Sequence, residues 1–401
     1  MGINAAKVLG NKDHVDVTLI DRNNYHLFQP LLYQVATAGL SPAEIAVPIR
    51  SIFSNYRNIK VMQAEVRGVD FDARIVDVSS GKLKYDYLIL GCGAKTTYFG
   101  NEHWKKHALG LKTVEQALEI RRKLLTAFEK AEASDQADEK SRSLTFVIVG
   151  GGSTGVELAG AIAELSRFTL ARDFRNIDPK QAKIILIEAG ERILPAFSKK
   201  LSATATRDLE SLGVEVRTRQ KITDIDEDGV YIGEQRIEAE TVIWSAGIQE
   251  PDINGQLKSH SGKAETITIE NDLSLADHPE VFIGGDQVGF MNQTSHPLPA
   301  VAPVALQQGR FIAETILRNL KGEKRRPFHY LDKGQLATIG RKKAVLQIGR
   351  LKMSGQLAWI AWLFVHIYYL IGFKNKFFVF LNWILAYFSF RKGARLIVNR
   401  Y

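Results

Sequence analysis

Three glycines, at positions 150, 152 and 155, follow the apolar segment 147–149 and precede a helix-like segment. A Gly-x-Gly-x-x-Gly turn between a strand and a helix is typical of a site for a dinucleotide pyrophosphate. Its first glycine permits the sharp turn, its second lets the phosphates approach the backbone, and its third lets the helix pack on the strand. Free N–H groups at the helix start face the phosphates. We therefore predict that Gly150, Gly152 and Gly155 bind a dinucleotide.

A second apolar strand, 183–187, ends at Glu188. A carboxylate at this position accepts hydrogen bonds from the ribose hydroxyls of adenosine and repels a 2′-phosphate, so the sequence favours NADH over NADPH. Arg192 weakens that preference, because it lies close to Glu188 in the sequence. The interval from the glycines to Glu188 exceeds the usual spacing of about 20 residues, and we interpret the polar, arginine-rich segment 166–183 as a surface insertion.

The N-terminal part of the chain repeats this plan. A helix-like segment, 2–9, precedes an apolar strand that ends at Asp21, and the segments 85–94 and 240–248 are apolar strands that end in small residues, one for each half. Two nucleotide-binding units in one chain suggest two nucleotides, of which a flavin and a nicotinamide are the natural pair. The repeat predicts an α/β chain with two Rossmann-like dinucleotide-binding domains.

A third segment supports the flavin. The apolar strand 281–283 leads through two glycines to Asp286, and an aspartate after such a turn can bind the ribityl chain of FAD. By itself this would be an ordinary turn at a strand end. Because it follows two nucleotide-binding units, we interpret Asp286 as part of the flavin site.

Composition excludes several classes of redox protein. A chain of 401 residues exceeds the size of one hydrophobic core, so two or three domains are expected. Its single cysteine, Cys92, excludes a redox-active cysteine pair, sulfur uptake by paired cysteines and a four-cysteine iron–sulfur cluster. We expect Cys92 to be a small buried residue, and the scattered histidines predict no metal site. The absence of disulfides and of a visible signal peptide predicts a cytosolic face.

The positive charge lies at the C-terminal end. Residues 321–401 carry 16 Lys or Arg against two acidic residues, whereas the rest of the chain has a net charge of −5. A basic tail can bind nucleic acid, but here the charges alternate with the apolar runs 357–373 and 377–390, which contain three of the five tryptophans. Aromatic rings with flanking cations are typical of a lipid headgroup layer. We therefore predict no nucleic-acid partner and a membrane-associating helical region.

The two apolar runs are short for membrane spans. Their 17 and 14 residues compare with about 20 for a helix that crosses the hydrocarbon core. Two helices lying in the interface would also avoid carrying the basic link between the runs across the bilayer. The alternative is a helical pair buried in a dimer interface, where cations would be costly. The predicted anchoring cations, within a lipid-contacting region 357–395, are Lys374, Lys376, Arg391, Lys392 and Arg395.

The chain resembles the two-dinucleotide-binding-domain flavoproteins, and among them the type II NADH dehydrogenases, which are single-chain NADH:quinone oxidoreductases. The resemblance runs essentially end to end, and its specific segments are 24–36, 150–160, 299–309 and 332–340. It implies FAD and NADH as cofactors, a membrane quinone as substrate, two-electron quinone reduction without proton pumping, a homodimer, and a peripheral position on the cytoplasmic face of the cell inner membrane.

The resemblance also implies a division into domains. Residues 1–112 and 237–328 correspond to the FAD-binding domain, residues 113–236 to the NADH-binding domain, and residues 329–401 to a C-terminal membrane-anchoring region. The charged and small residues of 131–142 predict a solvated loop near the boundary of the first two.

Roles for single residues follow from the same resemblance. Asp21 and Arg22 resemble adenosine contacts of FAD, and Asp286 resembles its ribityl contact. Glu157 resembles the family's carboxylate beside the flavin, although an acid in a first helical turn can also be a simple helix-start contact. Further residues implied in cofactor binding are Gly2, Gln34, Val66, Gly93, Gly247, Gly285, Gln307 and Gln308.

The residues implied in catalysis are Glu157, Gln307 and Lys333. A carboxylate beside a flavin pocket is positioned to meet nicotinamide or to relay a proton. Gln307 resembles a neighbour of the isoalloxazine and the quinone. Lys333 belongs to a segment that the family places near the quinone opening, and the alternative is an ordinary solvated turn lysine.

The sequence departs from the family's pattern in two places. Only the last glycine of the FAD fingerprint is present, as Gly2, so we expect the first sheet to lack its innermost strand and the flavin pyrophosphate to lack part of its N–H cradle. A late start codon or a shortened chain would explain this. Pro303 stands where many family members carry the first glutamine of a quinone motif, which removes one potential hydrogen-bond donor.

Two other functions are compatible with these observations. A soluble flavoprotein reductase of a ferredoxin- or rubredoxin-like carrier would dock an acidic partner on the basic C-terminal region. A redox-dependent binding protein would hold NADH and flavin with negligible turnover. Quinone-dependent NADH oxidation would distinguish both from the expected oxidoreductase.

Overall fold

The chain folds into two compact units. The computed structural model describes residues 1–260, 267–291, 297–389 and 393–397. The first unit comprises Met1–His26, Pro48–Lys95 and Ile248–Lys333, and the second comprises Leu27–Val47, Thr96–Gly247 and Gly334–Tyr401. The predicted anchoring cations Arg391 and Lys392 lie outside the described residues.

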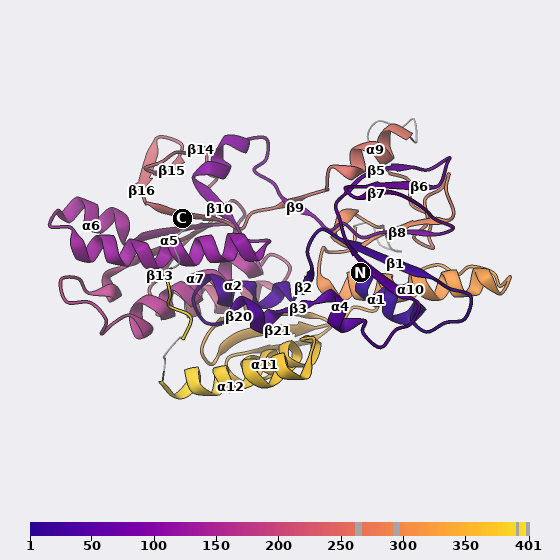
Figure 1. Ribbon diagram of the computed structural model, residues 1–401. Coiled ribbons are helices and arrows are strands. Elements are labelled where there is room, and N and C mark those ends of the chain that lie inside the picture. Colours follow the sequence, from indigo (N-terminus) through magenta and orange to yellow (C-terminus); the bar gives the residue numbers. More distant parts are fainter. Residues whose placement is uncertain (261–266, 292–296, 390–392, 398–401) are drawn as a thin grey trace. The chain divides into compact units, whose positions relative to one another are not determined.

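A five-stranded parallel sheet forms the centre of the second unit (Figure 1). Its central strand is buried along its whole length, which is expected of a parallel sheet covered on both faces. The strands, in spatial order, are β10 (Ala108–Gly110), β17 (Thr241–Trp244), β11 (Thr145–Val149), β12 (Lys183–Ile187) and β13 (Val214–Arg217). Its helices include α5 (Val114–Ala133), α6 (Ala137–Ser143), α7 (Ser153–Glu164) and α8 (Lys199–Ser211), and the strands β14 (Asp224–Ile225), β15 (Gly229–Ile232) and β16 (Gln235–Glu238) form a small antiparallel sheet.

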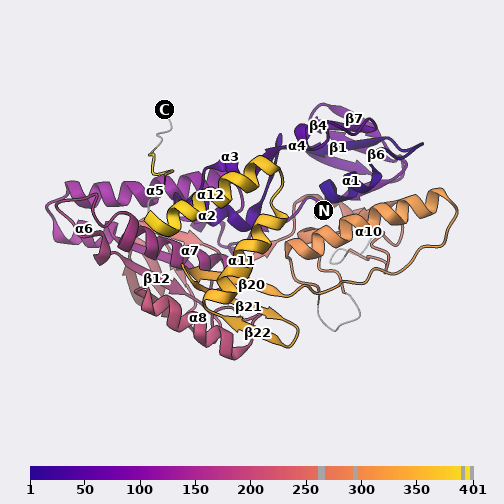
Figure 2. The ribbon, with the colours of Figure 1, turned by 90° about the horizontal axis from the view of Figure 1, so that it is seen from below.

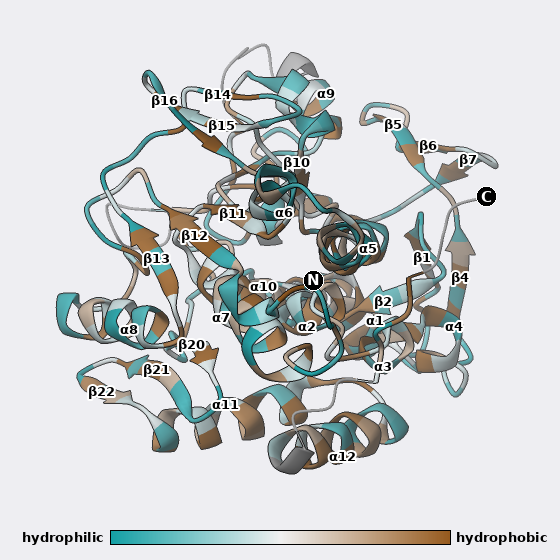
Figure 3. Cartoon of the chain, turned by 90° about the vertical axis from the view of Figure 1, so that its left-hand side faces the viewer, coloured by the Kyte–Doolittle hydropathy of each residue, from teal (hydrophilic) through white to brown (hydrophobic). Residues whose placement is uncertain are grey.

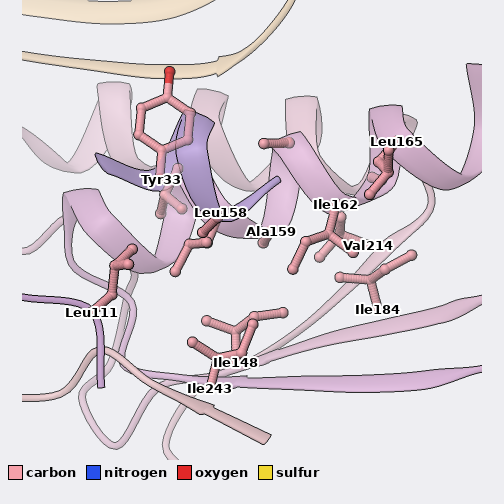
Figure 4. Packing of buried hydrophobic residues seen from close by; sticks show 14 of the residues in the cluster. Tyr33, Leu111, Ile148, Leu158, Ala159, Ile162, Leu165, Ile184, Val214 and Ile243 are labelled. Atoms are coloured by element: carbon pink, nitrogen blue, oxygen red, sulfur yellow. The ribbon is translucent and has the colours of Figure 1, made fainter. Parts of the chain in front are cut away.

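The apolar faces of the sheet and of α7 form the core of the second unit. Figure 4 shows Ile148, Ile184 and Ile243 of the sheet beneath Leu158 and Ile162 of α7. These five side chains are essentially fully buried. Each such burial contributes about 1.5–3 kcal/mol to folding, so this packing fixes where α7 lies on the sheet.

The C-terminal part of the chain packs within the second unit (Figure 2). Its strands β20 (Gln335–Gly340), β21 (Lys343–Ile348) and β22 (Leu351–Ser354) form an antiparallel sheet, followed by α11 (Gln356–Tyr369) and α12 (Phe373–Ser389). Asn375 of α12 donates to the carbonyl oxygens of Ala43 and Glu44, at 3.2 and 3.0 Å. No helix among the described residues is long and apolar enough to cross a membrane. The helices α2 (Leu32–Ala36) and α3 (Pro42–Ile45) complete this part.

The first unit is built from short sheets and from helices, of which α1 and α10 pack against each other. Strand β1 (Val17–Asp21) pairs in parallel with β4 (Ile59–Gln63), and β8 (Leu88–Leu90) with β19 (Val281–Ile283). No strand of the described residues joins these two pairs, so the first unit contains no continuous central sheet. Its other elements are α1 (Gly2–Leu9), α4 (Ile49–Ile52), α9 (Ile253–His260), α10 (Ala302–Leu320) and the antiparallel strands β5 (Val66–Asp70), β6 (Ile75–Val78) and β7 (Gly81–Lys84). The short strands β2 (Tyr25–Leu27), β3 (Ala46–Pro48), β9 (Lys95–Thr96) and β18 (Ile248–Gln249) lie where the chain passes between units.

Two predictions from the sequence are wrong. Residues 131–142 do not form a loop, because α5 continues to Ala133 and α6 begins at Ala137. The many charged residues of α6 are helix formers that occupy its exposed face, while Ser143 is buried. Cys92 is exposed rather than buried, because it follows the end of β8.

Candidate active site

The glycine turn at the start of α7 has the geometry that a bound pyrophosphate needs. Gly150 has a φ of +107°, and a Cβ there would lie 2.8 Å from the backbone nitrogen of Ala246. A Cβ at Gly155 would lie 1.9 Å from the carbonyl oxygen of Gly150. At Gly152, by contrast, a Cβ would meet nothing within 4 Å. The turn is therefore closed by backbone at two glycines and open at the third, where phosphates can approach the helix start.

Glu188 is held beside this turn by the backbone. Its Oε2 accepts a hydrogen bond from the Gly151 N–H and its Oε1 accepts one from the Gly190 N–H, both at 2.6 Å. The guanidinium of Arg192 instead donates to the carbonyl oxygens of its own loop, including that of Phe197 at 2.6 Å and that of Pro195 at 2.7 Å. Arg192 is thus turned toward the backbone, which leaves the carboxylate as the charged group at the end of β12.

The end of β17 closes the same turn. The Ser245 hydroxyl donates to the carbonyl oxygens of Val149 and Gly150, at 2.8 and 3.0 Å. Gly247 follows with a φ of +78°, and a Cβ there would lie 2.6 Å from the ring of Phe99. Both predicted glycines at the strand ends, Gly150 and Gly247, are therefore required by backbone geometry.

Glu157 lies one turn along α7 from the glycine turn. The Thr338 N–H donates to its Oε1 at 3.3 Å. Burial raises the pKa of the Glu157 carboxyl to about 8, and the Thr338 N–H and the Trp362 indole oppose that rise. At neutral pH the carboxyl is therefore mostly protonated. A carboxylic acid in this state can donate a proton, which a helix-start contact does not require.

The side chain of Gln34 connects two neighbouring aromatic residues. Its Nε2 donates to the Tyr33 hydroxyl oxygen at 3.0 Å, and its Oε1 accepts from the Trp383 indole N–H at 2.8 Å. Burial, and next the charge of Glu157, raise the pKa of Tyr33 well above its usual value, so the phenol stays neutral. Gln34 is thus linked to the surroundings of Glu157, a connection that the sequence did not predict.

In the first unit, the predicted adenosine residues lie at the end of β1. The Asp21 carboxylate accepts a hydrogen bond from the Asn23 N–H at 2.8 Å, and burial raises the pKa of Asp21 against the opposing effects of that bond and of Arg22. A Cβ at Gly2, where α1 begins, would meet nothing within 4 Å, and the same holds at Gly93, which has a φ of +72°. A strand-end carboxylate with open glycines fits the adenosine and pyrophosphate of a dinucleotide.

Buried amide side chains support the turn that carries Asp286. Gln308 accepts from the Gly285 N–H at 2.7 Å. The Gln287 amide accepts from the Cys92 N–H and donates to Asn254 Oδ1, both at 2.8 Å. Gln287, Gln308 and Asn254 are each at most 1% exposed. Asn254 and Gln287 were not predicted from the sequence, because no spacing signal marks a buried amide pair whose members are far apart in the chain.

Gln307 is tied to the segment that precedes Lys333. Its Nε2 donates to the Leu331 carbonyl oxygen at 2.9 Å, and its Oε1 accepts from the Leu331 N–H at 3.0 Å. Lys333 itself is exposed. Pro303 stands in the first turn of α10, where a missing N–H disrupts no helical hydrogen bond.

The structure thus groups the predicted residues by unit. The first unit brings together Gly285, Asp286 and Gln308, and separately Gln307 and the segment before Lys333. The second unit brings together the glycine turn and Glu188, with Glu157 on the same helix as the turn. Val66 begins β5 and pairs with Val78 of β6, away from these groups in the described sheet.

Comparisons with known proteins agree with this arrangement. The family model for the pyridine nucleotide-disulphide oxidoreductases matches residues 2–309, and the model for the NDH2 C-terminal domain matches residues 333–392. A type II NADH:quinone oxidoreductase of Mycobacterium tuberculosis, Ndh, is 40% identical over 100% of this chain and 88% of its own length. The chain belongs to the type II NADH:quinone oxidoreductases. This family, its α/β fold class and its activity are those predicted from the sequence.

A further relative supports the family, and a solved structure supports the fold. The second type II NADH:quinone oxidoreductase of Mycobacterium tuberculosis, NdhA, is 39% identical over 100% of this chain and 87% of its own length. The structure of NDH2 from Plasmodium falciparum in complex with NADH superposes with a TM-score of 0.90, at 22% identity, over 99% of this chain and 97% of that chain. Unlike the disulphide oxidoreductases of the wider family, this type II enzyme has a single cysteine and therefore no intramolecular cysteine pair.

Proposed function

We propose that this type II enzyme uses FAD to catalyse NADH + H⁺ + quinone → NAD⁺ + quinol, with the buried carboxyl of Glu157 as a proton donor to the quinone. The observation that carries the proposal is the construction of α7. One helix presents the dinucleotide turn at its start and, one turn later, a carboxyl that is protonated at neutral pH. Nucleotide binding and proton supply would then both depend on α7.

The second unit would bind NADH. Gly150, Gly152 and Gly155 would receive the pyrophosphate, with Gly247 at the neighbouring strand end, and Glu188 would accept hydrogen bonds from the adenosine ribose. Because Arg192 donates to its own loop, the carboxylate of Glu188 would meet a 2′-phosphate without a compensating cation from that residue. This arrangement supports a preference for NADH over NADPH.

The first unit would bind FAD. Asp21 and Arg22 would hold its adenosine and Asp286 its ribityl chain. Bound there, FAD supplies the ability to accept two electrons with a hydride and to return them to a second substrate. The protein supplies position: Gln308 fixes the Gly285 N–H, and with it the turn that carries Asp286. The remaining proposed contacts in this unit are Gly2, Val66, Gly93, Gly285, Gln307 and Gln308. Gln34, a residue of the second unit, stays a proposed cofactor contact.

Gln307 and Lys333 of the first unit would contribute contacts to the quinone. The reciprocal hydrogen bonds between Gln307 and Leu331 hold this glutamine next to the segment of Lys333. Two protons are needed to convert a quinone that has received two electrons into a quinol, and the Glu157 carboxyl can supply one of them. The carboxylate left behind is then reprotonated from solvent.

The C-terminal helices support peripheral association with a membrane. Helices α11 and α12 contain many hydrophobic residues (Figure 3). Several of their side chains are exposed, among them Phe364 at 71% and Phe373 at 86%. Lys374 and Lys376 flank this surface, and Arg395 pairs with Asp173. We propose that these helices lie in the lipid headgroup layer of the cytoplasmic face, and that the enzyme is a homodimer.

A comparison of electron acceptors tests the proposed function. Purified full chain loaded with FAD is mixed with NADH and a short-chain quinone, with a ferredoxin-like carrier, or with no acceptor, and NADH absorbance is followed. We expect rapid NADH oxidation only with the quinone, and a loss of at least tenfold in Glu157→Gln. Equal rates with the carrier protein, or full quinone turnover in Glu157→Gln, would contradict the proposal. Analytical ultracentrifugation in detergent tests the homodimer.

A further inference from the structure

Trp362 on α11 presents a buried donor without a partner. The side chain is 2% exposed, and its indole Nε1 has no hydrogen-bond partner within the described part of the chain. The other indole of this cluster, that of Trp383, is 5.2 Å away between ring centroids and does have a partner, Gln34. An unpaired buried N–H costs free energy, so an acceptor for it is expected close by.

The Glu157 carboxyl is the candidate acceptor for the Trp362 N–H. The indole acts on that carboxyl as a hydrogen-bond donor, which favours the ionised form and lowers the pKa. A formal hydrogen bond between them does not meet the geometric requirements. This is the arrangement expected for a donor beside a protonated acid, because a neutral carboxylic acid is a much weaker acceptor than a carboxylate.

His366 fixes the position of this indole without adding a charge. Its ring stacks on Trp362 with 4.1 Å between centroids, and its Nδ1 lies 2.7 Å from the Trp362 carbonyl oxygen. Because a carbonyl oxygen only accepts, Nδ1 carries the proton. Burial lowers the pKa of His366 to about 4, so the imidazole is neutral at pH 6–9. The Trp362 indole therefore contacts two neutral rings, those of His366 and Trp383, which restrict its position.

We propose that Trp362 is a positioning residue for proton transfer. Its indole N–H stabilises the Glu157 carboxylate once the proton of Glu157 has passed to the quinone. This inference rests on the proposed role of Glu157. The O–H bond of the Glu157 carboxyl breaks, a new O–H bond forms on the quinone oxygen, and the carboxylate takes up the waiting indole hydrogen bond. Both electrons come from NADH, and reprotonation of Glu157 from solvent releases the indole again.

Two ionisable side chains near Glu157, those of Tyr33 and His366, have pKa values shifted away from that range. Tyr33 on α2 has a pKa raised well above its usual value, and His366 on α11 has one lowered to about 4. Glu164 lies two turns farther along α7 and accepts the Arg341 N–H at 2.5 Å, and β20 contributes the Thr338 N–H. A pH effect on quinone reduction near pH 8 therefore reports Glu157.

The test compares two matched substitutions on one helix. Trp362→Phe removes the unpaired N–H and keeps an aromatic ring, whereas Trp359→Phe removes an indole that packs against Tyr387 instead. The pH dependence of kcat for a short-chain quinone is measured with FAD-loaded protein, and anaerobic stopped-flow measures flavin reduction by NADH separately.

Loss of the indole N–H should raise the pKa of Glu157 and weaken it as an acid. For Trp362→Phe we expect the pH at which kcat falls to half of its maximum to rise by about one unit, with kcat at pH 7 reduced about tenfold. In Trp359→Phe this midpoint pH should be unchanged. An unshifted midpoint in Trp362→Phe, or an equal shift in Trp359→Phe, overturns the inference.

A second measurement tests the inference even if the Trp362→Phe variant does not fold. The five indole N–H groups of the unaltered holoenzyme are labelled with ¹⁵N and assigned with the Trp359→Phe and Trp383→Phe variants. One resonance should titrate near pH 8 and become independent of pH in Glu157→Gln. If no indole titrates, the inference fails. If instead Glu157→Gln retains full quinone turnover, the proposed role of Glu157 fails first, so the two failures are distinguishable.

Discussion

Gly160 is the place where α7 meets β20 most closely, and an alanine there should loosen both. A Cβ at Gly160 would lie 1.7 Å from the Ile339 carbonyl oxygen, whereas real contacts of this kind essentially never fall below 3.0 Å. Helix and strand must therefore separate by more than about 1 Å, which forfeits a quarter to a half of the dispersion energy at the contact. Overpacking of this severity costs about 3 kcal/mol, and the better helix propensity of alanine returns about 1 kcal/mol.

The expected net loss for Gly160→Ala is about 2 kcal/mol, or a Tm lower by about 4–8 °C. The separation should also break the bond between the Thr338 N–H and Glu157 and raise the pKa of that carboxyl further. Gly152→Ala is the matched control, because a Cβ there meets nothing within 4 Å and the residue has an ordinary φ of −70°.

Thermal unfolding and the KM for NADH are measured for both variants. Gly152→Ala should keep its Tm within about 2 °C and raise KM at least tenfold, since the methyl group occupies the approach of the phosphates. An unchanged Tm in Gly160→Ala would refute the packing argument, and an unchanged KM in Gly152→Ala would refute the assignment of the pyrophosphate site.

Four further predictions follow from the same structure. Because the acid form of Glu157 is the donor, quinone turnover should fall about tenfold between pH 7 and pH 9, and a flat profile would contradict a pKa of about 8. Burial raises this pKa, so the folded chain binds more protons than the unfolded chain between about pH 4.5 and 8. Stability should decline with rising pH across that window, and less so in Glu157→Gln, as urea unfolding at several pH values would reveal. Glu188→Gln should reduce the preference for NADH over NADPH by at least tenfold in kcat/KM, and an unaltered ratio would show that another residue selects the cofactor. Phe373→Ser combined with Phe364→Ser should release the protein from anionic vesicles in a flotation assay while leaving its Tm nearly unchanged, whereas retained flotation would exclude these helices as the lipid contact.

The parts of the site that depend on local backbone geometry were predictable from the sequence. The glycine turn needs a positive φ at Gly150 and no side chain at Gly155, and no other residue type satisfies both conditions. Glu188 could be placed because a carboxyl group at the end of the second strand of such a unit is fixed by strand geometry. Neighbouring residues determine these features, so spacing alone reveals them.

The errors arose where burial decides the outcome. Residues 131–142 have a composition typical of loops, but packing against α5 and the sheet makes most of them helical. Asn254 and Gln287 gave no signal, because two amides 33 residues apart meet only in the folded chain.

The sequence by itself determined that this chain contains a dinucleotide turn, a ribose carboxylate, no cysteine pair, and a C-terminal region both apolar and basic. These are statements about residue type and spacing. Only the tertiary structure decided the chemistry of Glu157. Its pKa rises to about 8 because the surrounding elements exclude water from the carboxyl group. Those elements are β20, which provides Thr338, and α11, which provides Trp362, and they follow Glu157 by about 180 and 205 residues. Desolvation is a property of packing, and packing joins segments that no local pattern connects.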